Sequence, residues 1–251
     1  MKCTLFQFLA QNQQMRLKDA LASIPIVGTA AKEVWRRSML PIRLRFTKFC
    51  SADYWDARYS SGANSGNGSY GEVASFKAQI LNEFVLTYNI TSVIEFGCGD
   101  GNQLSLARYP KYVGFDVSPK AVEWCQNLFY HDASKRFLVY DRGRSNTERA
   151  ELTLSLDVIY HLVEDGIFER HMNDLFLAAT RFVIIYSDNE EAPRDTLHVR
   201  HRRFTDWIVN HEPEWQLIEH IPSKYPWKSE TEVGSWADFW IYARSKNRDG
   251  K

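Results

Sequence analysis

Apolar positions along the chain follow two periods, which predict short buried strands separated by helices. Apolar runs of five or six residues are typical of buried strands, and they cover 92–96, 112–117, 137–141, 152–157 and 182–186. Apolar residues recur every three or four positions over 72–88, 104–108, 119–129 and 168–180, which predicts helices. Strands that alternate with helices favour a parallel sheet with crossover helices, so the expected fold class is α/β.

The C-terminal part of the chain has a different pattern. A short helix is expected over 205–210, and strands are expected over 215–221 and 237–244. No long helix is predicted between these two strands, so we expect them to pair antiparallel. Together with the five earlier strands they give a doubly wound, mostly parallel sheet of seven strands whose last strand runs antiparallel.

The first fifty residues differ from the rest in charge. Apolar spacing over 4–22 and 29–40 predicts two amphipathic helices. Residues 1–50 hold nine Lys or Arg and two Asp or Glu, a net charge of +7, whereas the remainder carries −7. We therefore divide the chain into a basic helical N-terminal extension, 1–50, and one domain over 51–251. The extension could be a solvated arm, or it could contact an anionic membrane surface or a partner protein.

Composition places the chain among soluble globular proteins. Its 251 residues, 44% hydrophobic and 25% charged, suffice for one sizeable domain plus an extension. Four cysteines without CxxC spacing favour free thiols in a reducing compartment over a disulfide framework or a zinc site. No apolar run approaches the roughly 18 residues of a membrane span. We expect a cytoplasmic protein, and peripheral contact with the inner face of the membrane through 1–50 stays an open alternative.

The first chemical signal stands at the end of the strand predicted over 92–96. Glu95 is followed by three glycines at alternate positions, Gly97, Gly99 and Gly101. Glycine permits positive φ and a close backbone approach, so a ligand can lie against this turn. A dinucleotide-binding turn would instead have the pattern GxGxxG, and its third glycine position is occupied by an asparagine here. An acid before the first glycine would also repel a pyrophosphate, so a nicotinamide oxidoreductase is the weaker reading.

Carboxylates also end the next three predicted strands. Asp116 ends the second strand, Asp141 the third and Asp157 the fourth, and His161 follows shortly afterwards. Carboxyl ends of parallel strands meet at one edge of a sheet, so we expect these side chains near the glycine turn. Carboxylates there can accept hydrogen bonds from hydroxyl groups, and a histidine can accept a proton near neutral pH.

These residues resemble the first motifs of the class I S-adenosylmethionine (SAM)-dependent methyltransferases. The resemblance covers about 50–245 and implies a Rossmann-like sheet with SAM as cofactor. It implies that Glu95 and the glycines hold the methionine end, Asp116 the ribose and Asp141 the adenine side. The cofactor-binding residues expected from it are Tyr54, Glu95, Gly97, Cys98, Gly99, Asn102, Asp116, Val117 and Asp141.

The same resemblance places the methyl acceptor at the end of the fourth strand. Methyl transfer is an in-line displacement, in which the enzyme positions the acceptor and removes the proton of a hydroxyl group. We expect Asp157, His161 and His198 to orient or deprotonate the acceptor, and His161 has the better intrinsic pKa for a base. A structural cap is the alternative role of His161. Asp157 with Asp188 is similar to the magnesium site of catechol-type O-methyltransferases, but the rest of the chain is not, so no metal is expected.

Motifs that are missing from the sequence narrow the acceptor. No Asn/Asp-Pro-Pro-Tyr/Phe motif follows the fourth predicted strand and no Pro-Cys pair is present, which argues against exocyclic amines and pyrimidine carbons. No basic stripe interleaved with aromatic residues follows residue 50, so nucleic acid is not expected. The basic run over 198–203 could bind an anionic acceptor, or it could be a solvated loop.

Three further segments bear on the substrate. The aromatic element 54–59, the Ser/Gly-rich loop 60–71 and the Phe-Lys-Ala run 76–78 resemble small bacterial methyltransferases of polysaccharide and secondary-metabolite gene clusters. The loop is expected to cover the ligand, with a flexible linker as the alternative. The sequence therefore predicts O-methylation of a sugar, a glycan or another small-molecule hydroxyl. The alternative is a non-catalytic SAM-binding or scaffold protein that docks a membrane or a partner enzyme through 1–50.

Overall fold

The computed structural model describes residues 49–141, 147–192, 196–227 and 234–245. The chain divides into two units, Met1–Lys48 and Phe49–Lys251, and everything described below belongs to the second unit. The predicted basic extension thus lies outside the described residues except for its last two positions, and its helices and contacts stay predictions.

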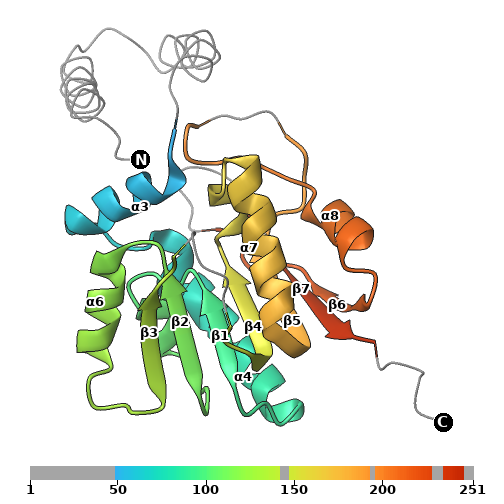
Figure 1. Cartoon of the computed structure of the whole chain (residues 1–251), viewed down its shortest axis with the longest axis horizontal. Helices are drawn as coiled ribbons and strands as arrows, with labels where there is room; N and C mark the ends of the chain where they lie inside the picture. The colour runs from blue at the N-terminus through green and yellow to red at the C-terminus, as the bar shows by residue number, and fades with distance from the viewer. Residues whose placement is uncertain (1–48, 142–146, 193–195, 228–233, 246–251) are drawn as a thin grey trace, which may run out of the picture. The chain divides into compact units, whose positions relative to one another are not determined.

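A seven-stranded sheet organises the second unit (Figure 1). Its strands follow the order β3-β2-β1-β4-β5-β7-β6. The strands β1 to β5 pair parallel, and β7 pairs antiparallel with both β5 and β6. The predicted sheet with an antiparallel last strand is therefore confirmed. The bounds are β1 Val93–Phe96, β2 Tyr112–Asp116, β3 Lys135–Val139, β4 Ala150–Leu156, β5 Ala179–Ser187, β6 Trp215–Ile221 and β7 Asp238–Arg244.

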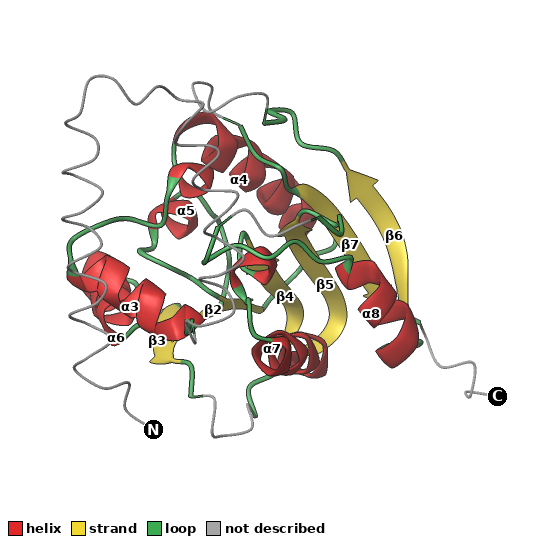
Figure 2. Cartoon of the chain, turned by 90° about the horizontal axis from the view of Figure 1, so that it is seen from above, coloured by secondary structure: helices red, strands yellow, loops and turns green. Residues whose placement is uncertain are grey.

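Helices cover both faces of this sheet, and Figure 2 shows α4 and α7 on opposite sides of the strands. No described helix is long and apolar enough to cross a membrane. The helix bounds are α3 Ser51–Ser60, α4 Gly71–Thr87, α5 Asn102–Ser105, α6 Pro119–Leu128, α7 Asp165–Ala178 and α8 Phe204–His211, with 3₁₀ turns η1 Asn67–Ser69 and η2 Ile159–His161.

Alternation along the central strands builds two hydrophobic cores, one on each face of the sheet. In β5, Phe182 and Ile184 belong to the core under α4, whereas Val183 and Ile185 belong to the core under α7. Both faces of the strand are therefore apolar, as expected for a parallel strand that helices cover on each side. The doubly wound arrangement follows from this pattern.

Three local features differ from the sequence expectation. The aromatic element near Trp55 forms the helix α3, which the sequence did not predict. Only Ser51 and Tyr59 of this helix are buried, so its sequence has no regular apolar stripe to indicate a helix. The helix expected over 104–108 is the four-residue α5, which begins after the left-handed Gly101. The third strand ends at Val139 and not at residue 141 as predicted.

Candidate active site

A cavity opens at the carboxyl ends of β1, β2 and β4, beside α3 and α4. Its empty volume, including the open mouth, is about 910 Å³. Residues 95–99, 115–117 and 156–158 line it from the strand ends. In an open α/β sheet this edge, where the strand order reverses, is the usual place for a ligand.

The turn after β1 requires glycine at two positions. Gly97 has φ 94° and Gly99 has φ 58°, a backbone region that side chains rarely tolerate. A Cβ atom on Gly97 would lie 2.4 Å from Val158 Cγ2, and one on Gly99 would lie 2.4 Å from Ser65 Oγ. The sequence thus leaves bare backbone at this wall of the cavity.

Asp116 lies beside this turn, buried at the end of β2. Its Oδ2 accepts a hydrogen bond from the Gly99 N–H at 3.0 Å, and its Oδ1 accepts one from the Ser118 N–H at 2.9 Å. Burial raises the pKa of Asp116 to about 6, although these backbone donors oppose the rise. Each carboxylate oxygen keeps a further lone pair, so Asp116 can still accept hydrogen bonds from two hydroxyl groups.

Glu95 is a second buried carboxylate in the cavity wall. Its Oε2 accepts a hydrogen bond from the Tyr112 hydroxyl at 2.7 Å. Burial raises the pKa of Glu95 to about 7, and the Tyr112 hydrogen bond and the charge of Lys77 oppose that rise. A cationic ligand group beside Glu95 would favour the ionised form.

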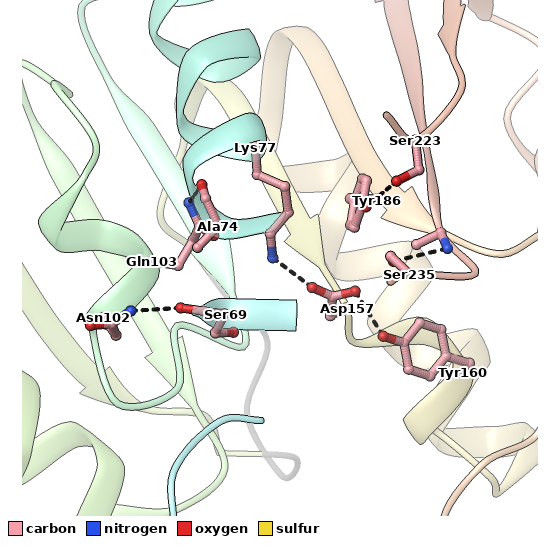
Figure 3. Close-up of polar contacts among 11 residues, drawn as sticks. Ser69, Ala74, Lys77, Asn102, Gln103, Asp157, Tyr160, Tyr186, Ser223 and Ser235 are labelled. Atoms are coloured by element: carbon pink, nitrogen blue, oxygen red, sulfur yellow. Dashed lines mark hydrogen bonds and ion pairs between the residues drawn. The ribbon is translucent and has the colours of Figure 1, made fainter. Parts of the chain in front are cut away.

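An ion pair stands at the end of β4 (Figure 3). Lys77 Nζ of α4 lies 2.6 Å from Asp157 Oδ2, and the Tyr160 hydroxyl donates to Asp157 Oδ1 at 2.7 Å. Asp157 has φ 59°, a strained value for a residue with a side chain. Both carboxylate oxygens of Asp157, which was predicted to orient or deprotonate the acceptor, are therefore hydrogen-bonded within the protein.

Sequence reasoning did not assign Lys77 to the site, although a signal was present. Lys77 follows the buried Val73 by four residues and precedes the buried Leu81 by four. Residues four apart share one face of a helix, so the apolar stripe of α4 already placed this lysine on the buried side.

His161 lines the same cavity, and His198 fixes its orientation. The Nδ1 atom of His161 lies 2.9 Å from the backbone oxygen of His198. A carbonyl oxygen only accepts, so Nδ1 carries the proton and Nε2 keeps a lone pair. Burial lowers the pKa of His161 to about 4, so the imidazole is neutral at pH 7. The ring of His198 stacks on His161 at 5.7 Å and on Tyr54 at 4.8 Å.

The structure divides the remaining predicted cofactor residues into two groups. Cys98 and Val117 line the cavity. Tyr54 is not among the described lining residues, and neither is His198, which was predicted to act on the acceptor; Tyr54 stacks on His198, and His198 stacks on His161. Asn102 also lies outside the lining, because its side chain donates to the backbone oxygen of a loop serine.

Asp141 does not line the cavity within the described part of the chain. It is exposed and lies two residues beyond the end of β3. Tyr140 is the residue of this connection that lines the cavity, and its hydroxyl donates to Asp174 of α7. The role of Asp141 at the adenine stays a prediction that the geometry does not favour.

The Ser/Gly-rich loop 60–71 contacts both ends of the cavity. The Ser65 N–H donates to Asp100 Oδ2 at 2.7 Å, and Ser65 Oγ accepts from the Asp100 N–H at 3.0 Å. Gly68 lies against the ion pair, because a Cβ atom there would be 2.8 Å from Asp157 Oδ2. This geometry is that of a covering loop.

The basic run over 198–203 makes contacts inside the protein. Arg200 and Arg202 both pair with Asp165 of α7, at 2.9 Å and 2.7 Å. Arg202 also donates to the backbone oxygens of Leu162 and Val163. These contacts give the two arginines a structural role and do not support their use for an anionic acceptor.

Asp188 and Asn189, which follow β5, are engaged away from Asp157. Asp188 Oδ2 lies 2.5 Å from His201 Nδ1, and the Asn189 side chain bonds Thr205 in the first turn of α8. Within the residues that the structure describes, no group of three or more His, Cys, Asp or Glu could hold a metal ion.

Solved structures similar to this one include several methyltransferases. The N-methyltransferase NodS from Bradyrhizobium japonicum WM9, in complex with S-adenosyl-L-homocysteine (SAH), has a TM-score of 0.63 at 13% identity, covering 78% of this chain and 99% of its own. Magnesium protoporphyrin IX methyltransferase (ChlM) from Synechocystis PCC 6803 with bound SAM has 0.58 at 14% identity, covering 79% and 99%. The methyltransferase domain of bacterial CtHen1 has 0.54 at 17% identity, covering 68% and 98%. No family model and no curated protein sequence matches the chain.

The chain therefore has the Rossmann-like fold of the class I SAM-dependent methyltransferases, as the sequence predicted. These neighbours differ in their named substrates, and their sequence identity to this chain is low. A shared fold does not transfer a substrate, so the acceptor must be argued from the site itself.

Proposed function

We propose that this protein is a SAM-dependent methyltransferase that methylates an oxygen atom of a small molecule. A hydroxyl group of a sugar or a glycan is the favoured acceptor. The observation that carries the cofactor assignment is the position of Asp116, whose carboxylate accepts the Gly99 N–H at 3.0 Å in the cavity at the end of β1 and β2. NodS was solved with SAH and ChlM with SAM, and both share this fold.

The residues in the cavity fit this cofactor. Gly97 and Gly99 keep the turn in a positive-φ conformation that places bare backbone at the cavity wall, and Asp116 retains lone pairs for the two ribose hydroxyls. Glu95 is buried with a raised pKa, which a cationic amino group would lower again. A nicotinamide dinucleotide would instead bring its pyrophosphate against two buried carboxylates.

Acid–base chemistry at the site favours a hydroxyl acceptor. Bound SAM supplies an electrophilic methyl group. His161 accepts the acceptor's hydroxyl proton at Nε2, because Nδ1 already donates to the His198 backbone oxygen. With its proton on His161, the acceptor oxygen would be the nucleophile for that methyl group, and SAH would be the leaving group. Asp157 is the weaker base, because Lys77 and Tyr160 already donate to its two oxygens, and it serves to orient the acceptor.

Calorimetric titration of the purified protein with SAH tests the cofactor assignment, with NAD as the control. We expect micromolar binding of SAH and none of NAD. Asp116→Asn should weaken SAH binding by roughly tenfold or more, because a charge-assisted hydrogen bond becomes a neutral one. Binding of NAD alone, or SAH affinity unchanged in Asp116→Asn, would overturn the assignment.

A screen of acceptors tests the reaction. Methyl transfer to hydroxyl-bearing sugars, followed as SAH release, is the expected result. A protein that binds SAH but turns over none of the hydroxyl, amine or thiol acceptors offered would support the scaffold alternative. Turnover of amines alone would show that the oxygen assignment is wrong.

A further inference from the structure

Lys77 is a buried cation whose hydrogen-bonding capacity is not used up. It is the only Lys or Arg among the described residues that line the cavity, and its side chain is 1% exposed. An ammonium group has three N–H donors. Within the described part of the chain, one donates to Asp157 at 2.6 Å and the group lies over the Tyr186 ring at 5.2 Å. No other acceptor for Lys77 is present among those residues.

Burial of an ammonium group is costly unless its donors find partners. Only Asp157 Oδ2 lies within hydrogen-bond distance of Lys77, while Oδ1 accepts from the Tyr160 hydroxyl. The remaining donors of Lys77 are therefore available to an acceptor that enters through the cavity. A ligand carboxylate satisfies both the charge and the hydrogen bonds of such a group.

Acceptor groups that fit a cation lie at the same end of the cavity. Glu95 lies close enough to Lys77 for their charges to interact, and it lines the same cavity. Gln103 is 7% exposed and donates from Nε2 to the backbone oxygen of Ala74, one turn before Lys77 on α4 (Figure 3). The Oε1 atom of Gln103 is buried and has no hydrogen-bond partner among the described residues.

At this end of the cavity Lys77 can therefore bind an anionic group, and Glu95 and Gln103 can bind a cationic group. We propose that Lys77 binds the carboxylate of the α-amino acid end of the cofactor, while Glu95 and Gln103 face its ammonium group. The inference rests on the proposed SAM site and adds Lys77 as the residue that recognises the carboxylate of the cofactor. An acceptor hydroxyl is neutral and would leave the charges of Lys77 and Glu95 without a complementary charged group.

Binding of two ligands to the full-length protein tests this inference. One is SAH, and the other is its decarboxylated counterpart, 5′-deoxy-5′-(3-aminopropylthio)adenosine, which keeps the amine and lacks the carboxylate. Wild type should prefer SAH by roughly ten- to hundredfold, the worth of a charged hydrogen bond. Lys77→Met should bind both ligands about equally, and Lys77→Arg should restore part of the preference. Because both ligands are titrated into the same protein, a partial loss of folding cancels in the ratio.

Three further variants serve as controls for the ratio of the two affinities. Lys120→Met removes an exposed lysine of α6, which pairs with Glu123 at 2.8 Å, and should leave the preference at its wild-type value. Lys77→Met leaves the Asp157 charge unpaired, so the ratio is also compared between D157N and the double variant K77M/D157N. The preference should persist in D157N and vanish in the double variant.

The outcomes separate this inference from the proposed function. If wild type binds SAH and Lys77→Met keeps the full preference for SAH over the decarboxylated ligand, Lys77 does not bind the carboxylate. The same conclusion follows if wild type binds both ligands equally. Wild type that binds neither ligand would instead refute the SAM site, and the assignment of Lys77 would fall with it.

Discussion

At the residue scale, ionising the buried carboxyl of Glu95 costs free energy, and a cationic ligand group beside it would offset that cost. Burial raises the pKa of its carboxyl from 4.5 to about 7. The folded protein therefore holds a proton that the unfolded chain releases, and stability falls as the pH rises from about 4.5 to 7. Ionising a buried group with such a shift costs on the order of 3 kcal/mol.

Glu95→Gln should therefore stabilise the free protein at pH 8. The amide oxygen can still accept the Tyr112 hydroxyl, and no charge has to be buried. We expect a midpoint of thermal unfolding several degrees higher than wild type at pH 8 and little difference at pH 4.5. Glu219→Gln, at an exposed position of β6, is the matched control. A destabilised variant at pH 8 would contradict this account of Glu95.

The same substitution should harm ligand binding, because the ionised Glu95 is what an ammonium group needs. SAH affinity of wild type should rise with pH through about 7, and binding near pH 6 should release a proton. Calorimetry in two buffers of different ionisation enthalpy measures that release. In Glu95→Gln the affinity should be lower and its pH dependence flat between 7 and 8, where Asp116, with a pKa of about 6, is already ionised. A wild-type affinity that falls over this range would refute the role.

His161 is the second residue whose role can be read from its protonation. With a pKa lowered to about 4, its imidazole is a free base over the whole neutral range. His161→Ala should lower kcat by roughly a hundredfold or more, as expected for loss of a general base, and leave SAH affinity unchanged. The acidic limb of the wild-type kcat profile should lie near pH 4 and not near 6.5. Full activity of His161→Ala would remove it as the base.

At the element scale, contacts within 65–70 hold the loop 60–71 against the strand ends. Asp100 accepts from the Ser65 N–H and from the Tyr70 hydroxyl. Between these two residues Gly68 packs against Asp157, which Lys77 holds in place. A small side chain at Gly68 therefore meets an immobile carboxylate.

Gly68→Ala should open this loop without unfolding the sheet. Its Cβ would lie 2.8 Å from Asp157 Oδ2, so the loop must lift. We expect faster cleavage within 60–71 in limited proteolysis and a severalfold faster release of SAH. Gly166→Ala is the control, because a Cβ atom there meets nothing within 4 Å in α7. Unchanged proteolysis in Gly68→Ala would show that the loop is not held at this point.

The elements that sequence reasoning found are those with a strong apolar period. Five of the strands were predicted from short apolar runs and the helix α4 from apolar residues at helical spacing, and these residues form the two cores. Sequence reasoning missed the helix α3, which contributes aromatic residues such as Trp55 to the cavity and has no apolar stripe. Sequence reasoning used the run 76–78 only for the family resemblance and gave Lys77 no role in the site, although its neighbours at four-residue spacing are buried.

Side-chain partnerships were harder to predict than positions. The strand ends correctly brought Glu95, Asp116 and Asp157 to one cavity. Spacing along the chain gave no sign that Tyr160 would occupy an oxygen of Asp157, or that His198 would support His161 through its backbone oxygen. Such contacts depend on loop conformation, which the hydrophobic pattern does not specify.

At the scale of the whole molecule, the cavity and the basic extension belong to different units of the chain. Every described residue that lines the cavity lies between Ser51 and His171, within the unit Phe49–Lys251. The first fifty residues carry a net charge of +7, and the remainder carries −7. Cofactor binding and attraction to an anionic surface should therefore be separable.

Removal of 1–48 should leave SAH affinity within about twofold of the full-length value, since the described lining is retained. The same truncation should abolish co-sedimentation with vesicles that contain anionic lipid, because each Lys or Arg near such a surface contributes about 1 kcal/mol. Binding of the full chain should weaken in high salt, which screens these charges. If the truncated protein lost SAH, residues before Phe49 would have to complete the site; if it still bound the vesicles, the attraction would have to come from the acidic unit, against its net charge.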